Sequence, residues 1–523
     1  MATVAARLRQ PRPRLAPGRF APLAAAVLLG GAVAGFTLAL QGHSALKVVA
    51  ILIVVAGTIW CATTRRTALA LGVWMLYVGL LDAPLKLATG SSVVTLVRDV
   101  LLFAICAGVL VRAVVEHRTL RLPPLSGWVL GFVAVVLAQL FNPADGSLYH
   151  SIGGIRQEIE FVPLFFLTAT YVRDKRTLRW FLILLLVIGT ANGIASWIQF
   201  NETPQQLAAW GPGYAQRVLG TGNFAFAGRT FYTATGQEFT RPFGLGTDSG
   251  EGGVVGGLAL AAALALLLIA RVRWRWRTFA ILAALAGSVV AVYTSEGRAA
   301  FVASGVCVFA FAMLAFNVRG RRTSAIAVCV GAVLAFLVVQ SVVRSNSSTT
   351  TRYGGLTASS ILSTTQSARG KDFAAIPTNL RDYPFGDGLG VAGPAAGVSG
   401  APAMAETVNA ETEVSFLVLE VGIPGAVLLI GMTLHLGLLA LRRVRTEPDT
   451  NTRLMLAGAT APIAGVLALY TVTALTPSTP VGPYLWGIAG VISYWCVTRP
   501  AELRVAQAPR SPDRLQATSL TRG

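Results

Sequence analysis

Residues 254–293 read VVGGLALAAALALLLIARVRWRWRTFAILAALAGSVVAVY, and this stretch decides the fold. Two apolar runs, Val254–Ala270 and Thr278–Tyr293, are joined by a loop with Arg at positions 271, 273, 275 and 277. A helical run of roughly 20 apolar residues matches the ~30 Å hydrocarbon core of a bilayer. Arginines concentrated in a short connecting loop are typical of the cytoplasmic side of a membrane protein. The stretch therefore predicts two membrane-crossing helices and a basic turn between them.

The same pattern recurs along the whole chain. Of its 523 residues, 54% are hydrophobic and 13% are charged, whereas a soluble domain carries roughly 25% charged residues. The apolar runs are continuous, which argues against the ~10-residue alternating strands of a membrane β-barrel. We therefore expect an all-α, polytopic transmembrane helix bundle with about fourteen spans. The predicted spans are Ala21–Leu40, Leu46–Thr63, Thr67–Leu81, Val93–Val115, Leu125–Phe141, Ile155–Val172, Leu178–Phe200, Val254–Ala270, Thr278–Tyr293, Ala299–Phe316, Ala325–Val343, Thr412–Leu441, Leu454–Leu475 and Val481–Val497.

The loops between these spans are by turns strongly basic and nearly free of net charge. This alternation predicts an inner-membrane-type protein with both termini and every basic loop on the cytoplasmic side. Two loops on the outer side are long, and the second is predicted to be catalytic. The predicted organisation is a basic N-terminus 1–20, N-terminal helices 21–200, an outside loop 201–253, central helices 254–343, a large outside loop 344–411, C-terminal helices 412–498 and a disordered tail 499–523.

The net charge of +20 would suggest nucleic acid as a partner in a soluble protein. Here the basic residues stand at the ends of apolar runs, so we expect anionic membrane lipids as partners and no nucleic acid. The five cysteines lie within or at the ends of apolar runs and have no metal-ligand spacing. The sequence therefore predicts neither a metal nor a cofactor.

Several charged residues lie in the outer halves of predicted spans. Arg98 and Asp99 lie one turn from the outer end of the fourth span, and Arg298 lies in the short outside turn that enters the tenth. Arg156, Glu158 and Glu160 begin the sixth. A charge inside a bilayer costs several kcal/mol unless it is paired or faces a cavity. For each residue taken alone, the simpler interpretation is a side chain that reaches back to the membrane interface. Taken together, these charges predict a polar cavity that opens outward.

The second long loop and the start of the span that follows it contain a distinctive set of motifs. Pro384–Gly390 reads PFGDGLG, and Phe416–Gly425 reads FLVLEVGIPG. The three glycines of the first motif follow no strand, so a nucleotide-binding loop is rejected. In their order, these motifs resemble the O-antigen ligase and O-antigen polymerase-like membrane glycosyltransferases of bacterial envelopes. The resemblance covers roughly residues 155–431.

Four further segments carry this resemblance or depart from it. Arg369 resembles the arginine of the family's large periplasmic loop, and Arg241-Pro-Phe-Gly244 resembles its Arg-x-x-Gly stretch. Thr294–Ala299 resembles a Thr-x-Ser-Arg-Gly segment at the start of a helix. The family's His-Asn pair is missing, because Glu413-Val414 stands in its place. Either Glu413 or Glu411 has taken over the role of proton acceptor, or the chain is a divergent member with altered chemistry.

The resemblance implies a GT-C-like bundle that transfers or polymerises glycan from a polyprenyl-pyrophosphate donor, such as undecaprenyl pyrophosphate, to a glycan or lipid acceptor. Arginines suit the binding of pyrophosphate, because the guanidinium is planar and permanently charged. We therefore predict Arg298, Arg369, Arg241 and Arg156 as substrate-binding residues, Glu413 or Glu411 as the catalytic base, and a reaction without metal. The alternatives are a multi-pass transporter or flippase of lipid-linked sugars, which is expected to have broken helices near the midplane, and a non-catalytic assembly scaffold.

Overall fold

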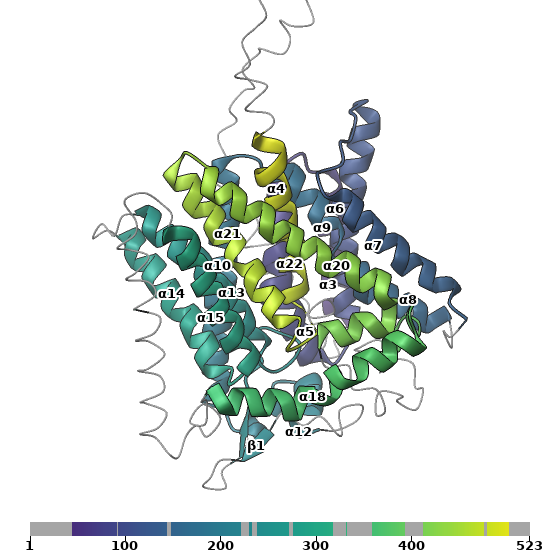
Figure 1. Ribbon diagram of the computed structural model, residues 1–523, viewed down its shortest axis with the longest axis vertical. Coiled ribbons are helices and arrows are strands. Elements are labelled where there is room, and N and C mark those ends of the chain that lie inside the picture. Colours follow the sequence, from purple (N-terminus) through teal and green to yellow (C-terminus); the bar gives the residue numbers. More distant parts are fainter. Residues whose placement is uncertain are drawn as a thin grey trace, which may run out of the picture.

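The computed structural model describes residues 44–91, 93–143, 148–220, 230–232, 238–270, 276–316, 331, 358–392, 412–474 and 479–500. This part of the chain forms a bundle of helices with one small hairpin, β1 and β2 (Figure 1). Eight of the described helices are long and apolar enough to cross a membrane, which confirms the predicted all-α membrane-type bundle. The elements are α3 (Ser44–Thr63), α4 (Thr67–Tyr77), the π-helical η1 (Val78–Asp82), α5 (Ala83–Thr89), α6 (Val93–Val115), α7 (Ser126–Ala138), η2 (Gln139–Phe141), α8 (Leu148–Ile159), α9 (Pro163–Tyr171), α10 (Lys175–Phe200), α11 (Pro204–Ala208), α12 (Pro212–Leu219), β1 (Thr230–Tyr232), β2 (Glu238–Thr240), α13 (Glu251–Ala270), α14 (Trp276–Thr294), α15 (Arg298–Phe316), α18 (Ala358–Asp382), α20 (Glu413–Thr446), α21 (Thr450–Leu469), α22 (Val481–Ser493) and η5 (Tyr494–Thr498).

The centre of the bundle is built around α13, which packs against α10, α14, α15 and α21. Nearly all of α13 is buried, and its sequence consists mostly of Gly, Ala and Leu. Small residues let membrane helices approach closely, so that van der Waals contact replaces the missing hydrophobic driving force. A Cβ atom at Gly256 would lie 2.6 Å from Cβ of Ala291, and one at Gly193 would lie 1.8 Å from the carbonyl oxygen of Gly287. These glycines therefore set the spacing of α10, α13 and α14.

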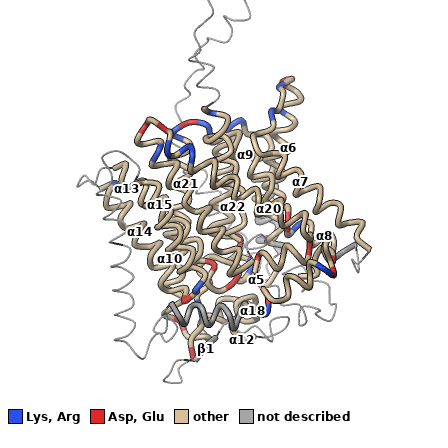
Figure 2. The backbone as a smooth tube through the Cα atoms, viewed as in Figure 1, with Lys and Arg blue, Asp and Glu red and all other residues tan. Residues whose placement is uncertain are grey.

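The basic loops gather at one end of the bundle, beside α6, α9 and α21, which we call the basic end (Figure 2). Lys175 donates a hydrogen bond to Asp449 at 2.6 Å and thereby joins the starts of α10 and α21. The hydrogen bonds from Lys175 and Thr452 lower the pKa of the Asp449 carboxyl to about 2. Arg499 stacks on Trp495 with 4.0 Å between guanidinium and ring centre. We call the opposite end, where α12, α18 and β1 lie in Figure 1, the distal end.

The loop that follows α10 forms an ordered cap at the distal end. Its helices α11 and α12 bury a small apolar cluster with the end of α5. In this cluster the rings of Tyr214 and Phe243 meet edge to face at 5.6 Å. The cluster consists of Leu87, Leu207, Tyr214, Val218 and Phe243. Two aromatic residues of the predicted outside loop 201–253, Tyr214 and Phe243, therefore pack onto the bundle.

Three predicted elements differ from the structure. The sixth span, Ile155–Val172, is divided into α8 and α9, since the chain breaks at Glu160 and Pro163 begins the second helix. Proline is favoured at the first position of a helix because its missing N–H would have no partner there. The third span continues beyond Leu81 through η1 to the end of α5. Within the predicted outside loop 344–411, residues 358–382 form the helix α18. The span Ala21–Leu40, the span Ala325–Val343 except for residue 331, the N-terminus 1–20 and residues 501–523 of the tail lie outside the described residues.

Candidate functional site

A buried network of charges surrounds Arg98 on α6, whose side chain is only 4% exposed. Its Nη1 donates to Asp82 at 3.1 Å and to Oγ1 of Thr479 at 2.8 Å. Its Nε donates to Asp99 at 3.1 Å, and its Nη2 forms an ion pair with Glu160. One planar guanidinium therefore binds three carboxylates that come from η1, α6 and the break between α8 and α9, a geometry that lysine does not reproduce.

Arg156 on α8 completes this network. Its Nη2 lies 2.6 Å from Asp99 and its Nε lies 3.7 Å from Glu160. We call these five residues the Arg98 network: Arg98, Arg156, Asp82, Asp99 and Glu160. The network contains three carboxylates and two guanidinium groups. Arg156 was predicted to bind substrate, and the structure shows it 39% exposed at the edge of the network and paired with two acids.

A second polar group, which we call the carboxylate set, consists of Glu158 on α8 and of Glu413 and Glu420 on α20. All three side chains are buried, and Glu158 lies within electrostatic range of both others. Oε1 of Glu420 accepts hydrogen bonds from the backbone N–H groups of Gly390 and Ala392 at 3.1 and 3.2 Å. The set is therefore brought together by α8, α20 and the loop that follows α18.

That loop begins with Pro384–Gly390, which we call the glycine turn. Gly386, Gly388 and Gly390 have φ angles of 95°, 113° and 76°, values that favour glycine because it has no Cβ. The turn fits against a break in α20 at Gly422, whose φ is 63° and ψ is −163°. The N–H of Ile423 donates to the carbonyl of Pro384 at 2.9 Å, and the N–H of Asp387 donates to the carbonyl of Leu419 at 2.7 Å. Partial burial in this loop raises the pKa of the Asp387 carboxyl.

The close fit of the glycine turn leads to a prediction about Gly386. A Cβ atom there would lie 2.6 Å from the carbonyl oxygen of Glu420, and φ is positive. Gly386→Ala is therefore expected to destabilise the protein by about 1–3 kcal/mol, seen as a lower unfolding temperature in detergent. The matched control is Gly370→Ala, since Gly370 lies inside α18 with open space around it. Alanine is favoured over glycine in a helix by ~1 kcal/mol, so an equal loss in both variants would contradict the prediction.

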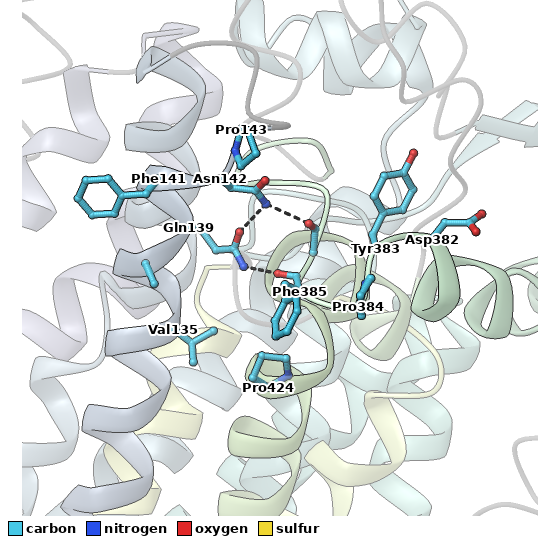
Figure 3. A pocket seen from close by; sticks show the side chains of 12 residues that line it. Val135, Gln139, Phe141, Asn142, Pro143, Asp382, Tyr383, Pro384, Phe385 and Pro424 are labelled. Atoms are coloured by element: carbon cyan, nitrogen blue, oxygen red, sulfur yellow. Dashed lines mark hydrogen bonds between the residues drawn. The ribbon is translucent and has the colours of Figure 1, made fainter.

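An open cleft of about 520 Å³ adjoins the glycine turn (Figure 3). Its walls are the end of α7, the end of α18, the glycine turn and Pro424. The side-chain amide of Gln139 donates to the carbonyl of Phe385, and Nδ2 of Asn142 donates to the carbonyl of Gly386 at 3.0 Å. Phe385 is 73% exposed, and Phe141 is 87% exposed. The cleft is thus a largely apolar recess beside the glycine turn.

The cleft adjoins an apolar outer surface of the bundle. Leu137 on α7 and Ile423 and Val427 on α20 are exposed in the isolated chain. Exposed apolar residues of this kind on membrane-type helices are expected to face lipid tails. An apolar chain in the surrounding lipid therefore has a short route to the cleft.

The structure places the two predicted catalytic residues differently. Glu413 is the first residue of α20 and is completely buried, at the distal end near Tyr470 of α21. The preceding N–H of Thr412 donates to Asp372 of α18 at 3.2 Å, so α18 holds the start of α20 in place. Glu411 lies outside the described residues.

The predicted binding arginines are spread over the distal end. Arg298 begins α15 and is half-buried, and none of the ion pairs among the described residues includes it. Arg369 was expected on a loop, whereas it lies within α18, and its side chain is outside the described part of the structure. Arg241 is half-buried and lies just before a turn that is fixed to α10. In this turn the N–H groups of Phe243 and Gly244 donate hydrogen bonds to Oε1 of Gln199 on α10, both at 2.8 Å.

Sequence reasoning assigned no role to several residues that the structure brings into the site. Glu158 and Glu420 belong to the carboxylate set, and Asp82 belongs to the Arg98 network. Asp82 was placed just beyond a predicted span, so nothing in the sequence paired it with Arg98.

Within the described ranges, no group of three or more His, Cys, Asp or Glu residues has the geometry to hold a metal ion. Comparisons of the chain with models of protein families, with curated proteins and with solved structures found no match.

Proposed function

We propose that this chain is an integral-membrane glycosyltransferase of the O-antigen ligase or polymerase type. It transfers or polymerises glycan from a polyprenyl-pyrophosphate-linked donor at the distal end of the bundle. The observation that carries this proposal is the buried carboxylate Glu413, which lies at the distal end in a set with Glu158 and Glu420. Such a carboxylate suits the removal of a proton from an acceptor hydroxyl.

The proposed reaction needs little from the protein beyond positioning and one base. Glu413 accepts the proton as the O–H bond of the acceptor breaks, and the acceptor oxygen forms a bond to the anomeric carbon of the donor sugar. The bond between that carbon and the phosphate oxygen breaks, and polyprenyl pyrophosphate leaves with the electron pair. We assign the pyrophosphate to Arg298, because none of the ion pairs among the described residues includes it, whereas Arg156 is already paired with Asp99 and Glu160.

The cleft beside the glycine turn supports a lipid-linked donor. Its apolar walls adjoin lipid-facing residues of α7 and α20, while Gly386 at its edge packs against the backbone of Glu420. A polyprenyl chain in this cleft would therefore hold its sugar end close to the carboxylate set. The acceptor is a glycan or a lipid.

The donor-binding role of arginine gives a second prediction. Arg298→Lys and Arg369→Lys keep the charge but lose the planar fork that binds phosphate through two hydrogen bonds. Each variant is expected to lose at least about tenfold in kcat/KM, roughly 1.4 kcal/mol of transition-state stabilisation. The control is Arg118→Lys, which alters an exposed arginine at the basic end. Wild-type activity in both distal variants, at equal expression, would remove these arginines from the site.

The proposed location requires the distal end to face outward from the bacterial cytoplasmic membrane, with both termini in the cytoplasm. A third prediction follows from this orientation. In a chain without its five native cysteines, a cysteine at Lys371 on α18 should react with an impermeant maleimide added to intact spheroplasts. A cysteine at Thr446, at the basic end, should react only after permeabilisation. The reverse pattern would invert the proposed topology.

A transporter or flippase of lipid-linked sugars is the second candidate function. It is favoured by the non-helical Gly422 inside α20, since transporters often bind substrates at interrupted helices. The buried Arg98 network also favours a transporter, because charged groups inside membrane helices often line the path of a substrate or ion.

One experiment separates the two functions. Purified protein in sealed vesicles is incubated with a polyprenyl-pyrophosphate oligosaccharide labelled in its sugar. Release of the lipid carrier together with a lengthened or transferred glycan supports the transferase, and Glu413→Gln should abolish it. Movement of chemically unchanged substrate across the bilayer supports the transporter and contradicts the transferase.

A further inference from the structure

Glu158 on α8 is a buried carboxyl group for which the reaction above has no use. Its side chain is 1% exposed, and neither of its oxygens has a hydrogen-bond partner among the residues that the structure describes. A buried polar group without a partner is costly, and an ionised one is more costly still. The chemical state of Glu158 therefore needs an explanation.

The groups that face Glu158 do not neutralise a negative charge. The electrostatic effects on its carboxyl come from Glu420 and Glu413 of α20, and Glu158 in turn acts on the hydroxyl of Tyr470 at the end of α21. On α8 itself, Arg156 is paired with Asp99 and Glu160, toward the Arg98 network. Glu158 is thus packed among groups that are negative or neutral.

Two other buried glutamates, Glu420 and Glu160, are stabilised in ways that Glu158 is not. Glu420 accepts hydrogen bonds from two backbone N–H groups and from Nε2 of Gln157 at 3.4 Å. Glu160 forms ion pairs with Arg98 and Arg156. Three carboxyl groups of similar burial therefore have three different environments, and that of Glu158 favours the neutral acid.

We propose that Glu158 is a proton-binding site that carries its proton at neutral pH and acts as a positioning residue for Glu413. A neutral Glu158 removes one negative charge from the site, which leaves Glu413 ionised and able to accept a proton. It also lowers the repulsion of an anionic pyrophosphate donor. The protonation of Glu158 stands on the geometry of the carboxylate set, whereas its use in catalysis rests on the proposed function.

The protonation can be tested without any substrate. Infrared spectra of the purified protein in lipid bilayers at neutral pH should contain the carbonyl band of a buried, protonated carboxylic acid. This band should lose intensity in Glu158→Gln and keep its full intensity in Glu116→Gln, which alters an acid at the basic end. Absence of the band from the wild-type protein, or its persistence at full strength in Glu158→Gln, would overturn the proposal.

A second measurement uses only the wild-type chain and so does not depend on the folding of a variant. The apolar reagent dicyclohexylcarbodiimide modifies protonated carboxyl groups, and peptide mass spectrometry locates the product. Glu158 is expected to be modified at neutral pH and progressively less as the pH rises, whereas Asp99, paired with Arg98 and Arg156, should stay unmodified. Modification of Asp99 with an unmodified Glu158 would contradict the proposal.

The catalytic role is tested separately by the pH profile of glycan transfer. In the wild type, KM for the donor should rise at alkaline pH as Glu158 ionises and repels the pyrophosphate. In Glu158→Gln this rise should be absent, because the amide cannot ionise, and the profile of Glu116→Gln should match the wild type. An unchanged profile in Glu158→Gln would refute the positioning role. If no variant and no wild-type sample transfers glycan, the proposed function fails while the infrared result still decides the protonation.

Discussion

Glu413→Gln is expected to lower the turnover number by about 10²–10⁴-fold while leaving donor binding intact. Glutamine has nearly the same shape as glutamate but cannot accept a proton from the acceptor hydroxyl. Glu413 is completely buried at the first position of α20, where the helix N-terminus favours a negative charge. The variant therefore removes basicity with little change in packing. Turnover is measured as release of the polyprenyl carrier, and binding as the retention of labelled donor by the purified protein.

Two further variants make the Glu413 experiment decisive. Glu116→Gln changes an acid that pairs with Arg118 at the basic end, and its turnover should equal that of the wild type. Glu411→Gln tests the other acid that the sequence motif offers as a base. If Glu411→Gln is inactive and Glu413→Gln is not, the role moves by two residues. If both retain turnover, the transferase has no base at this position, and the transporter becomes the better account.

The bundle could be predicted from the sequence because its determining signal is local. Each apolar run must satisfy its backbone hydrogen bonds within itself in a bilayer, so length and composition alone predict a helix. For this reason Val254–Ala270 corresponds closely to α13, and Leu125–Phe141 corresponds to α7 with η2. The helix α18 was missed because its residues are polar and carry no span-length apolar run. The break between α8 and α9 was missed because the ion pairs of Glu160 with Arg98 and Arg156 depend on tertiary contacts.

The candidate site was only partly predictable for the same reason. Glu413 was identified because Glu413-Val414 stands where the resembling family has its His-Asn pair, just before the Phe416–Gly425 motif. Glu158 was noticed as a charge at the start of a span, but its meeting with Glu413 and Glu420 requires the glycine turn to bring α8 and α20 together. In particular, a Cβ at Gly154 of α8 would lie 2.6 Å from the backbone nitrogen of Gly390. Such a contact joins residues more than two hundred positions apart, and no local pattern encodes it.

Arg98→Lys is expected to reduce the free energy of unfolding by about 3–5 kcal/mol, which is the usual loss when one partner of a buried ionic group is removed. The single ammonium of lysine cannot replace the hydrogen bonds and ion pairs that Arg98 forms with Asp82, Asp99 and Glu160. At least one carboxylate would remain buried without a cation. The loss is measured by denaturant titration of the protein in mixed micelles. The matched control is Arg118→Lys, because Arg118 is 72% exposed and an exposed ion pair contributes only about 0–1 kcal/mol.

A double variant distinguishes a charge network from simple packing around Arg98. Asp82→Asn removes one of the three acids, so the double variant Arg98→Lys/Asp82→Asn should lose clearly less stability than the sum of the two single variants. Additive losses, or a loss below 1 kcal/mol in Arg98→Lys, would show that the carboxylates do not depend on this guanidinium. The network also holds Arg156 and Glu160, which flank Glu158 on the same chain segment. Weakening it should therefore displace Glu158 from Glu413, so Arg98→Lys is expected to lower glycan transfer even though Arg98 does not contact the reacting groups.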